Sequence, residues 1–350
     1  MMRKIIIAIC VFLGAGLFTF QISEKEFFSR HALSATPMKF KIPKGFPGPQ
    51  YKFENNPLTV EGFELGRKLF YDGRLSKDGN FPCASCHQQF AAFATFDHAL
   101  SHGFKDQFTT RNAPALFNVA WMKELHWDGG INNLEVQPLA PITAGNEMAE
   151  NIDTVIAKLK ADPGYRRMFT RAFGDGRINS QRMLKALAQF VAMLVSANSK
   201  YDKVQRGEAV FSPSEQLGYA VFRSKCAACH KEPLFTDDSY RNTGLTVNGR
   251  INDYGRMAIT GNPNDSLKFK VPSLRNVYLT FPYGHDGRFY SVGAVVDHYR
   301  FHVVNGPTTD SLLRNKLNIS DDERFNLLLF LRTLTDSGFI SNKRFSAPPP

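Results

Sequence analysis

Two copies of one short motif contain the residues best suited to bind a cofactor or metal. The stretches FPCASCH and KCAACH hold four of the five cysteines, each in the form Cys-x-x-Cys-His. Cysteines three positions apart on a helical turn face the same way, so both thiols can bond the two vinyl groups of one porphyrin. The adjoining histidine then reaches the porphyrin iron. The pattern predicts two covalently bound c-type haems, held by Cys83, Cys86 and His87 and by Cys226, Cys229 and His230.

Three other uses of such cysteines compete with haem attachment. Zinc ribbons separate their cysteine pairs by roughly 15 to 20 residues, whereas Cys86 and Cys226 are 140 positions apart (226 − 86). A thioredoxin-like redox pair belongs beside a βαβ unit and needs no histidine in the next position. A structural cysteine pair, as in a disulfide framework, stays open as the remaining alternative.

The N-terminus and the charge bear on where the protein works. Arg3 and Lys4 precede an apolar run from Ile5 to Phe20, which contains Cys10, so residues 1–22 are predicted to be an export signal or a membrane anchor. The run is shorter than the ~20 residues that a spanning helix needs, and whether it is cleaved stays open. The net charge is +11, but the Lys and Arg residues are scattered, so we expect no nucleic-acid partner.

An internal repeat indicates how the chain is organised. APALFNV at 113–119 is echoed by VPSLRNV at 271–277, and WDG at 127–129 by HDG at 285–287, with the same offset of 158 positions. Helical patterns flank long loops, and no clear alternating strands are present, so the fold is expected to be mostly α. The predicted division is a segment 1–22, a linker 23–54, two halves 55–205 and 206–340, and a tail 341–350.

Residues 55–335 resemble the bacterial di-haem cytochrome c peroxidase and MauG family. The resemblance is carried by the two haem motifs, RNAPALFN, WDG, VPSLRN, HDG, and Gln137 and Glu147 ten residues apart. It implies two cytochrome c-like domains with one covalent haem each: an N-terminal peroxidatic domain, and a C-terminal domain for electron transfer. It also assigns Glu147 as the acid-base group at the first haem, Gln137 as its distal companion, and Trp127 as the electron relay between the haems.

Without the resemblance, these three residues have ordinary explanations. Glu147 is a carboxylate just ahead of a helix, where the helix dipole favours it. Gln137 is a surface amide, and Trp127 is a core aromatic beside a turn. The resemblance further implies a calcium ion between the haems, bound by Asn112, Thr280 and Pro282 through an amide oxygen and two backbone carbonyls. On the residues alone these would be turn positions.

The distal ligand of the second haem decides the subtype. Many peroxidases of the family carry Met fourteen residues after the HDG histidine, where this chain has Tyr299 and MauG also has Tyr. A phenolate favours ferric and higher iron states, whereas a thioether raises the potential. Tyr299 is therefore the predicted ligand, with a core position in its helix as the alternative. The other candidates are Met257, His298 and His302.

The distal ligand of the resting first haem is also open. Family members that need reductive activation cap the resting iron with a loop histidine, and this chain has His102 nine residues before Arg111. MauG-type chains lack that histidine. The alternatives are a solvated loop histidine at 102 and the neighbouring His98.

The predicted function is a periplasmic di-haem peroxidase that reduces hydrogen peroxide to water. Its electrons would come from a small donor protein, either a c-type cytochrome or a cupredoxin. The first alternative is a MauG-like oxidase that modifies a partner protein through high-valent haem, and the second is a non-enzymatic two-haem electron carrier. Homodimerisation and anchoring by the N-terminus stay open.

Overall fold

A computed structural model describes residues 35–349, so the predicted export signal or anchor at 1–22 lies outside the described residues. No helix within 35–349 is long and apolar enough to cross a membrane.

The prediction of a mostly helical fold is confirmed, and the only sheet in this part of the chain has two short antiparallel strands, with Tyr240 opposite Lys270. The elements are α2 (Val60–Phe70), α3 (Cys83–Cys86), α4 (Leu139–Thr143), α5 (Ile152–Ala161), α6 (Pro163–Phe173), α7 (Ser180–Ala192), α8 (Lys200–Gln205), α9 (Pro213–Lys225), β1 (Tyr240–Arg241), α10 (Met257–Thr260), β2 (Phe269–Lys270), α11 (Val292–Asp297), a π-helix (His298–His302), α12 (Asp321–Arg332) and α13 (Ser337–Ile340).

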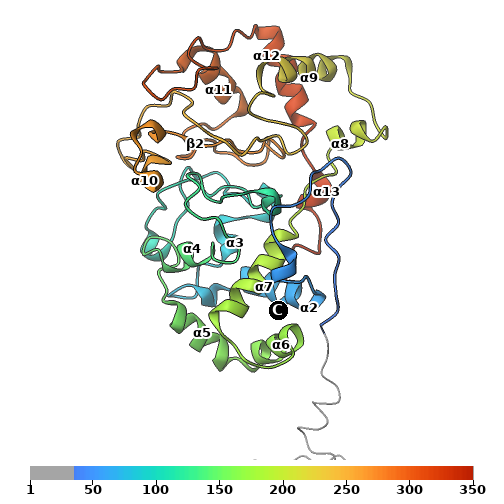
Figure 1. The fold of residues 1–350 in the computed structure, drawn as a ribbon, viewed down its shortest axis with the longest axis vertical. Coiled ribbons are helices and arrows are strands. Elements are labelled where there is room, and N and C mark those ends of the chain that lie inside the picture. The colour runs from blue at the N-terminus through green and yellow to red at the C-terminus, as the bar shows by residue number, and fades with distance from the viewer. Residues whose placement is uncertain (1–34, 350) are drawn as a thin grey trace, which may run out of the picture.

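Two helix pairs form the centres of two hydrophobic cores. Helix α2 packs on α7 in the part drawn lower in Figure 1, and α9 packs on α12 in the upper part. Each pair crosses at a glycine: a Cβ at Gly66 would lie 1.9 Å from the Ala186 carbonyl oxygen, and one at Gly218 would lie 2.0 Å from that of Asn326. Only a residue without a side chain permits this approach. In each half the haem motif follows the first helix of the pair, directly after α9 at Cys226 and, beyond α2, after the intervening residues 71–82 at Cys83.

Polar caps fix where the second pair of helices begins. Ser212 and Glu215 form a capping box at the start of α9, and Ser320 and Glu323 form one at the start of α12. In each box the serine hydroxyl accepts from the backbone N–H three residues on, while the glutamate accepts from the serine N–H. The chain therefore enters α9 at a defined register, which sets the position of Cys226 at its end.

The repeated asparagines join the two halves at one point. Asn118 exchanges hydrogen bonds with the backbone of Ser196, at 3.0 and 2.9 Å, and Asn276 donates to the Ser196 hydroxyl at 2.9 Å. The side chain of Asn276 also accepts from the Asp336 N–H at 2.8 Å. All four residues are buried. The P-x-L-x-N-V repeat thus ends each time in an asparagine that ties its half to the same connecting segment.

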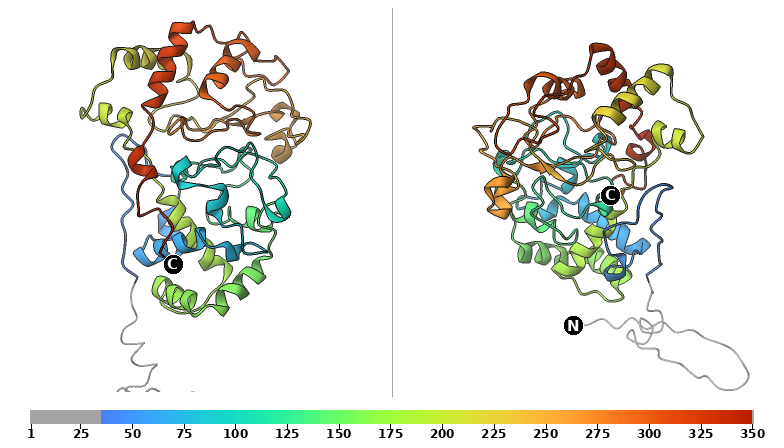
Figure 2. Two further views of the ribbon diagram at one scale, coloured as in Figure 1. Left: turned by 180° about the vertical axis from the view of Figure 1, so that it is seen from behind. Right: turned by 45° about the horizontal axis from the view of Figure 1, so that its top comes forward.

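Both ends of the described chain run along the body. Residues 37–53 pass beside the two parts (Figure 2), with Phe40 and Phe46 packed on Trp121. At the other end, Phe339 and Phe345 belong to the core built on α2 and α7. The C-terminal residues therefore pack on the part of the protein that carries the first haem motif. The division into haem domains at 205/206 stays a prediction.

Candidate haem and peroxide site

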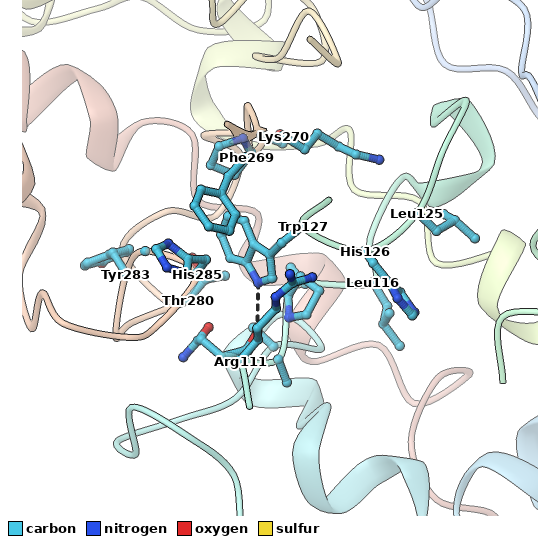
Figure 3. A pocket seen from close by; sticks show the side chains of 18 of the residues that line it. Arg111, Leu116, Leu125, His126, Trp127, Phe269, Lys270, Thr280, Tyr283 and His285 are labelled. Atoms are coloured by element: carbon cyan, nitrogen blue, oxygen red, sulfur yellow. Dashed lines mark hydrogen bonds between the residues drawn. The ribbon is translucent and has the colours of Figure 1, made fainter. Parts of the chain in front are cut away.

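One cavity of about 880 Å³ brings the predicted site residues together. It is lined by both Cys-x-x-Cys-His motifs and by residues of the P-x-L-x-N-V and x-D-G repeats. The predicted site residues on its wall outside the haem motifs are His102, Asn112, Trp127, Gln137, Glu147, Thr280, Pro282 and Tyr299. Figure 3 shows part of this wall around Trp127. Residues more than 150 positions apart in the sequence thus share one chamber.

The two motif histidines are held in the same way. His87 Nδ1 donates to the Phe93 carbonyl at 3.0 Å, and His230 Nδ1 donates to the Phe235 and Pro272 carbonyls at 3.2 and 3.1 Å. Burial lowers the pKa of His87 to about 4, so its ring is neutral. A histidine that donates through Nδ1 to a carbonyl presents Nε2 as a basic metal ligand. Both side chains therefore fit the proximal position of a haem iron.

The four motif cysteines are free thiols rather than disulfides. Burial raises the pKa of Cys83 and of Cys226 to about 12, which leaves them without the thiolate character of a reactive redox pair. Nowhere in residues 35–349 do three or more His, Cys, Asp or Glu side chains gather as a metal cluster. Two cysteine pairs on one apolar cavity, each beside a histidine with a free Nε2, fit a porphyrin.

Glu147 lies in the loop after α4 with its carboxyl group facing this cavity. Its backbone is fixed by two hydrogen bonds, from Glu147 N–H to Ala144 at 3.0 Å and from Phe104 N–H to Glu147 at 2.7 Å. No residue within 35–349 donates to the carboxylate, and burial raises its pKa above the usual range of a glutamate. A half-buried carboxyl group with a raised pKa is suited to taking and returning a proton. This placement differs from the helix-dipole alternative, because α5 begins five residues later at Ile152.

Gln137 meets a residue that the sequence reasoning missed. Its side-chain nitrogen Nε2 lies 3.2 Å from His126 Nε2, and both side chains line the cavity. Burial lowers the pKa of His126. The only local signal was the position of His126 directly before WDG, which by itself indicates nothing about Gln137 eleven residues later.

Trp127 is fixed between the two halves by its backbone and its ring. The indole N–H donates to the Asn112 carbonyl at 2.9 Å, and the Lys270 N–H donates to the Trp127 carbonyl at 2.7 Å. Figure 3 shows the indole and its hydrogen bond on the cavity wall. Trp127 thus lies on the wall of the cavity that both haem motifs line.

The residues of the predicted calcium site all line the cavity. Asn112 donates from its amide nitrogen to the Ala99 carbonyl at 3.0 Å, so its side-chain oxygen is left as an acceptor. The Asn112 N–H donates to the His285 carbonyl at 2.8 Å, which ties this position to the segment of Thr280 and Pro282. Amide and carbonyl oxygens are hard ligands that suit Ca²⁺. Calcium binding stays a prediction.

The four candidates for the second distal position separate in space. Tyr299 lies in the π-helix and faces the cavity beside Cys226 and Cys229, and burial raises its pKa. His298 also lines the cavity, but its Nε2 is engaged, because it donates to the Thr243 carbonyl at 2.8 Å. His302 is exposed and lies off the cavity, whereas Met257 also lines it. Single π-helical turns occur often at functional sites.

The loop histidine His102 stands at the edge of the cavity near Glu147. Its Nδ1 pairs with Asp106 at 2.5 Å, which leaves Nε2 free, and its ring packs on Phe108 at 4.5 Å. The following Gly103 lies against the backbone of Glu147, where a Cβ would be 2.7 Å from the Glu147 Cα. His98 forms an ion pair with Asp97 and lies off the cavity wall. Of the two, His102 is therefore the one placed to approach the first haem.

Comparison with known proteins decides the family. A family model described as di-haem cytochrome c peroxidase matches residues 60–210. The methylamine utilization protein MauG of Methylophilus methylotrophus is 35% identical over 303 residues, which cover 85% of this chain and 88% of that protein. The chain belongs to the di-haem cytochrome c peroxidase family. Its relatives also include the cytochrome c551 peroxidase of Nitrosomonas europaea, 34% identical over 80% of this chain and 81% of that one.

A solved structure supports the same placement. A MauG-like protein associated with microbial copper homeostasis is 32% identical and superimposes with a TM-score of 0.82, covering 89% of this chain and 99% of that chain. Membership in the di-haem peroxidase family makes this protein an oxidoreductase and implies two c-type haems. The family contains both MauG proteins and cytochrome c peroxidases.

Proposed function

We propose that this di-haem protein reduces hydrogen peroxide to water at the first haem, with electrons supplied by a small c-type cytochrome or cupredoxin. The observation that carries the proposal is Glu147: a half-buried carboxyl group without a hydrogen-bond donor among residues 35–349, facing the cavity shared with His87. Cys83, Cys86 and His87 would hold the haem, which would supply the iron chemistry for O–O cleavage. An export signal at 1–22 would place the protein in the periplasm.

Side chains of the protein transfer the proton that peroxide cleavage requires. Heterolytic cleavage of peroxide needs a proton moved from the inner to the outer oxygen. Glu147 in its carboxylate form accepts that proton and then returns it to the leaving water. Its raised pKa helps the first half of this task, because the carboxylate is then a stronger base toward the peroxide proton. Gln137 borders the same space and orients the bound molecule.

The chain also provides the path for electrons between the two sites. Trp127 lines the cavity shared by both haem motifs, and its indole is held by Asn112, a residue of the proposed calcium site. Calcium bound there by Asn112, Thr280 and Pro282 would order the segment on which Trp127 rests. Relay through Trp127 is part of the same proposal.

Turnover with a natural type of donor tests this function. The haem-loaded protein is mixed with a reduced small c-type cytochrome, or in parallel with a reduced cupredoxin, and hydrogen peroxide is added. We expect two donor molecules to be oxidised per peroxide consumed. Oxidation of neither donor, with peroxide left intact, would contradict the proposal and favour the two-haem electron carrier.

A second candidate function rests on Tyr299. A tyrosine at the distal side of the second haem stabilises oxidised iron, which suits a MauG-like oxidase acting on a partner protein. Tyr299 lines the cavity beside Cys226 and Cys229, and no residue within 35–349 forms a hydrogen bond with its hydroxyl. The phenol oxygen is therefore available to an iron held by His230.

Replacement of Tyr299 by Met tests this ligand. The thioether should raise the reduction potential of the second haem on the order of a few hundred mV, within the ~0.8 V that axial ligands span. A spectroelectrochemical titration measures it, and His302→Gln serves as a control because His302 is exposed and off the cavity. An unchanged potential in Tyr299→Met would show that Tyr299 does not ligate the iron.

A further inference from the structure

The contact between His126 and Gln137 fixes which atoms are donors. An amide nitrogen carries two N–H groups and no accepting lone pair. At 3.2 Å, Gln137 Nε2 must therefore donate to His126 Nε2, whose proton sits on Nδ1. The Gln137 side-chain oxygen then points away from His126. None of residues 35–349 donates to that oxygen, and Gln137 lines the cavity, so the oxygen is open to a ligand there.

The backbone of His126 is held in an unusual conformation that presents the ring to the cavity. Its φ is +66°, in the left-handed region that few non-glycine residues adopt. The Leu125 N–H donates to the Ile131 carbonyl at 2.6 Å and closes the loop around this position. Figure 3 shows His126 and Trp127 extending in different directions from consecutive positions. Backbone strain of this kind persists where surrounding contacts impose it, and it clusters at functional sites.

The groups around the His126 ring keep it neutral. Burial lowers its pKa, and the positive charges of Arg111 and Lys270 add to that effect. The opposing charge is Asp128, which is itself paired with Arg111 at 2.5 Å. A neutral ring can accept through Nε2, as the contact with Gln137 requires.

We propose that His126 is a positioning residue that locks the Gln137 amide with its oxygen toward the first haem. Gln137 then accepts a hydrogen bond from a bound molecule and does not donate one. Hydrogen peroxide fits this arrangement, because one O–H can donate to the Gln137 oxygen while Glu147 takes the other proton. The inference rests on the proposed function, in that the first haem binds its ligand on the side of Gln137.

Fluoride is a suitable probe, because bound fluoride accepts hydrogen bonds and cannot donate one. The dissociation constant of fluoride from the ferric first haem is measured by absorbance in the full haem-loaded chain. All variants are made in a His102→Ala background, which removes the proposed cap. His126→Phe frees the amide to turn its N–H₂ toward fluoride. We expect binding to tighten at least ~10-fold, as a charge-assisted hydrogen bond of about 1.5 kcal/mol or more would give.

Two further variants identify the cause. His126→Gln keeps an acceptor for the Gln137 N–H and should bind fluoride as weakly as the parent. His126→Phe combined with Gln137→Leu should lose the gain, because the donor is gone. An unchanged affinity in His126→Phe, a gain that survives Gln137→Leu, or no fluoride binding in any variant would each overturn the proposal. Fluoride binding does not require turnover. The fluoride result can therefore be interpreted even if the protein proves not to be a peroxidase.

Discussion

Replacing Glu147 by Gln is expected to lower the rate of peroxide turnover at least ~100-fold, because positioned acid-base groups typically contribute 10² to 10⁴. Glutamine has nearly the shape of glutamate but accepts no proton at neutral pH. The haem spectrum and the fold should stay as in the parent, since no residue within 35–349 donates a hydrogen bond to the Glu147 carboxylate. Steady-state oxidation of a reduced small cytochrome measures the effect.

The matched control is Glu135→Gln, which lies just before α4 and off the cavity wall. Its turnover should equal that of the parent. Undiminished turnover in Glu147→Gln would remove Glu147 from the mechanism. The variant would then behave as expected of an electron carrier.

The pH dependence of the reaction provides a separate test of the same carboxyl group. Burial raises the pKa of Glu147, so its carboxylate form is lost on acidification at a higher pH than that of an exposed glutamate. The rate of reaction with peroxide should therefore fall as the pH drops through this raised pKa. In Glu147→Gln, the residual rate should no longer fall at low pH. If the rate of the variant still fell at the same low pH, another titrating group would be responsible for the pH dependence.

Replacing Asp202 by Asn is expected to cost about 3–5 kcal/mol of folding free energy, the range found when one partner of a buried ion pair is removed. Arg275 is fully buried, and its guanidinium donates to both Asp202 oxygens, at 2.9 and 2.8 Å. This pair ties α8 to the VPSLRN segment, whose Pro272 carbonyl holds His230. Asparagine would leave the Arg275 charge buried without a counter-charge.

Urea unfolding of the haem-loaded chain measures this loss. Glu64→Gln is the control, because it breaks a half-exposed ion pair with Arg67 and should cost less than ~1 kcal/mol. Burial pushes the pKa of Asp202 upward, but the hydrogen bonds and charge of Arg275 outweigh it and hold the pKa low. The parent therefore keeps this stabilisation at neutral pH and loses it only as the pH falls below about 4, through the lowered pKa. Equal midpoints for the parent and Asp202→Asn would contradict the assignment.

The sequence predicted those features that depend on local spacing. A cysteine pair followed by histidine, the helical pattern from Val60 to Phe70, and the 158-residue repeat were all visible without coordinates. The family resemblance then selected Gln137, Glu147 and Trp127, and the structure places all three on one cavity wall. Their roles remain proposals.

The features that were missed depend on contacts between distant segments. The role of His126 depends on its contact with Gln137. That contact could not be predicted, because the conformation of the loop between the two residues does not follow from its sequence. The convergence of Asn118 and Asn276 on Ser196 likewise requires both halves to be in place. The repeat showed that the two asparagines occupy equivalent positions, but no pattern in the sequence indicated Ser196 as their common partner.

The central claim is that peroxide reacts at the haem held by His87, beside Glu147. Stopped-flow absorbance tests it most directly: one equivalent of hydrogen peroxide is added to the fully ferric protein and, separately, to the half-reduced protein. We predict a rapid change in the haem spectrum in at least one form. Reaction of the ferric form would mean an open first haem and would favour the MauG-like branch with Tyr299, whereas reaction only after half-reduction would support a cap by His102. No reaction in either form would contradict the account and leave a two-haem electron carrier.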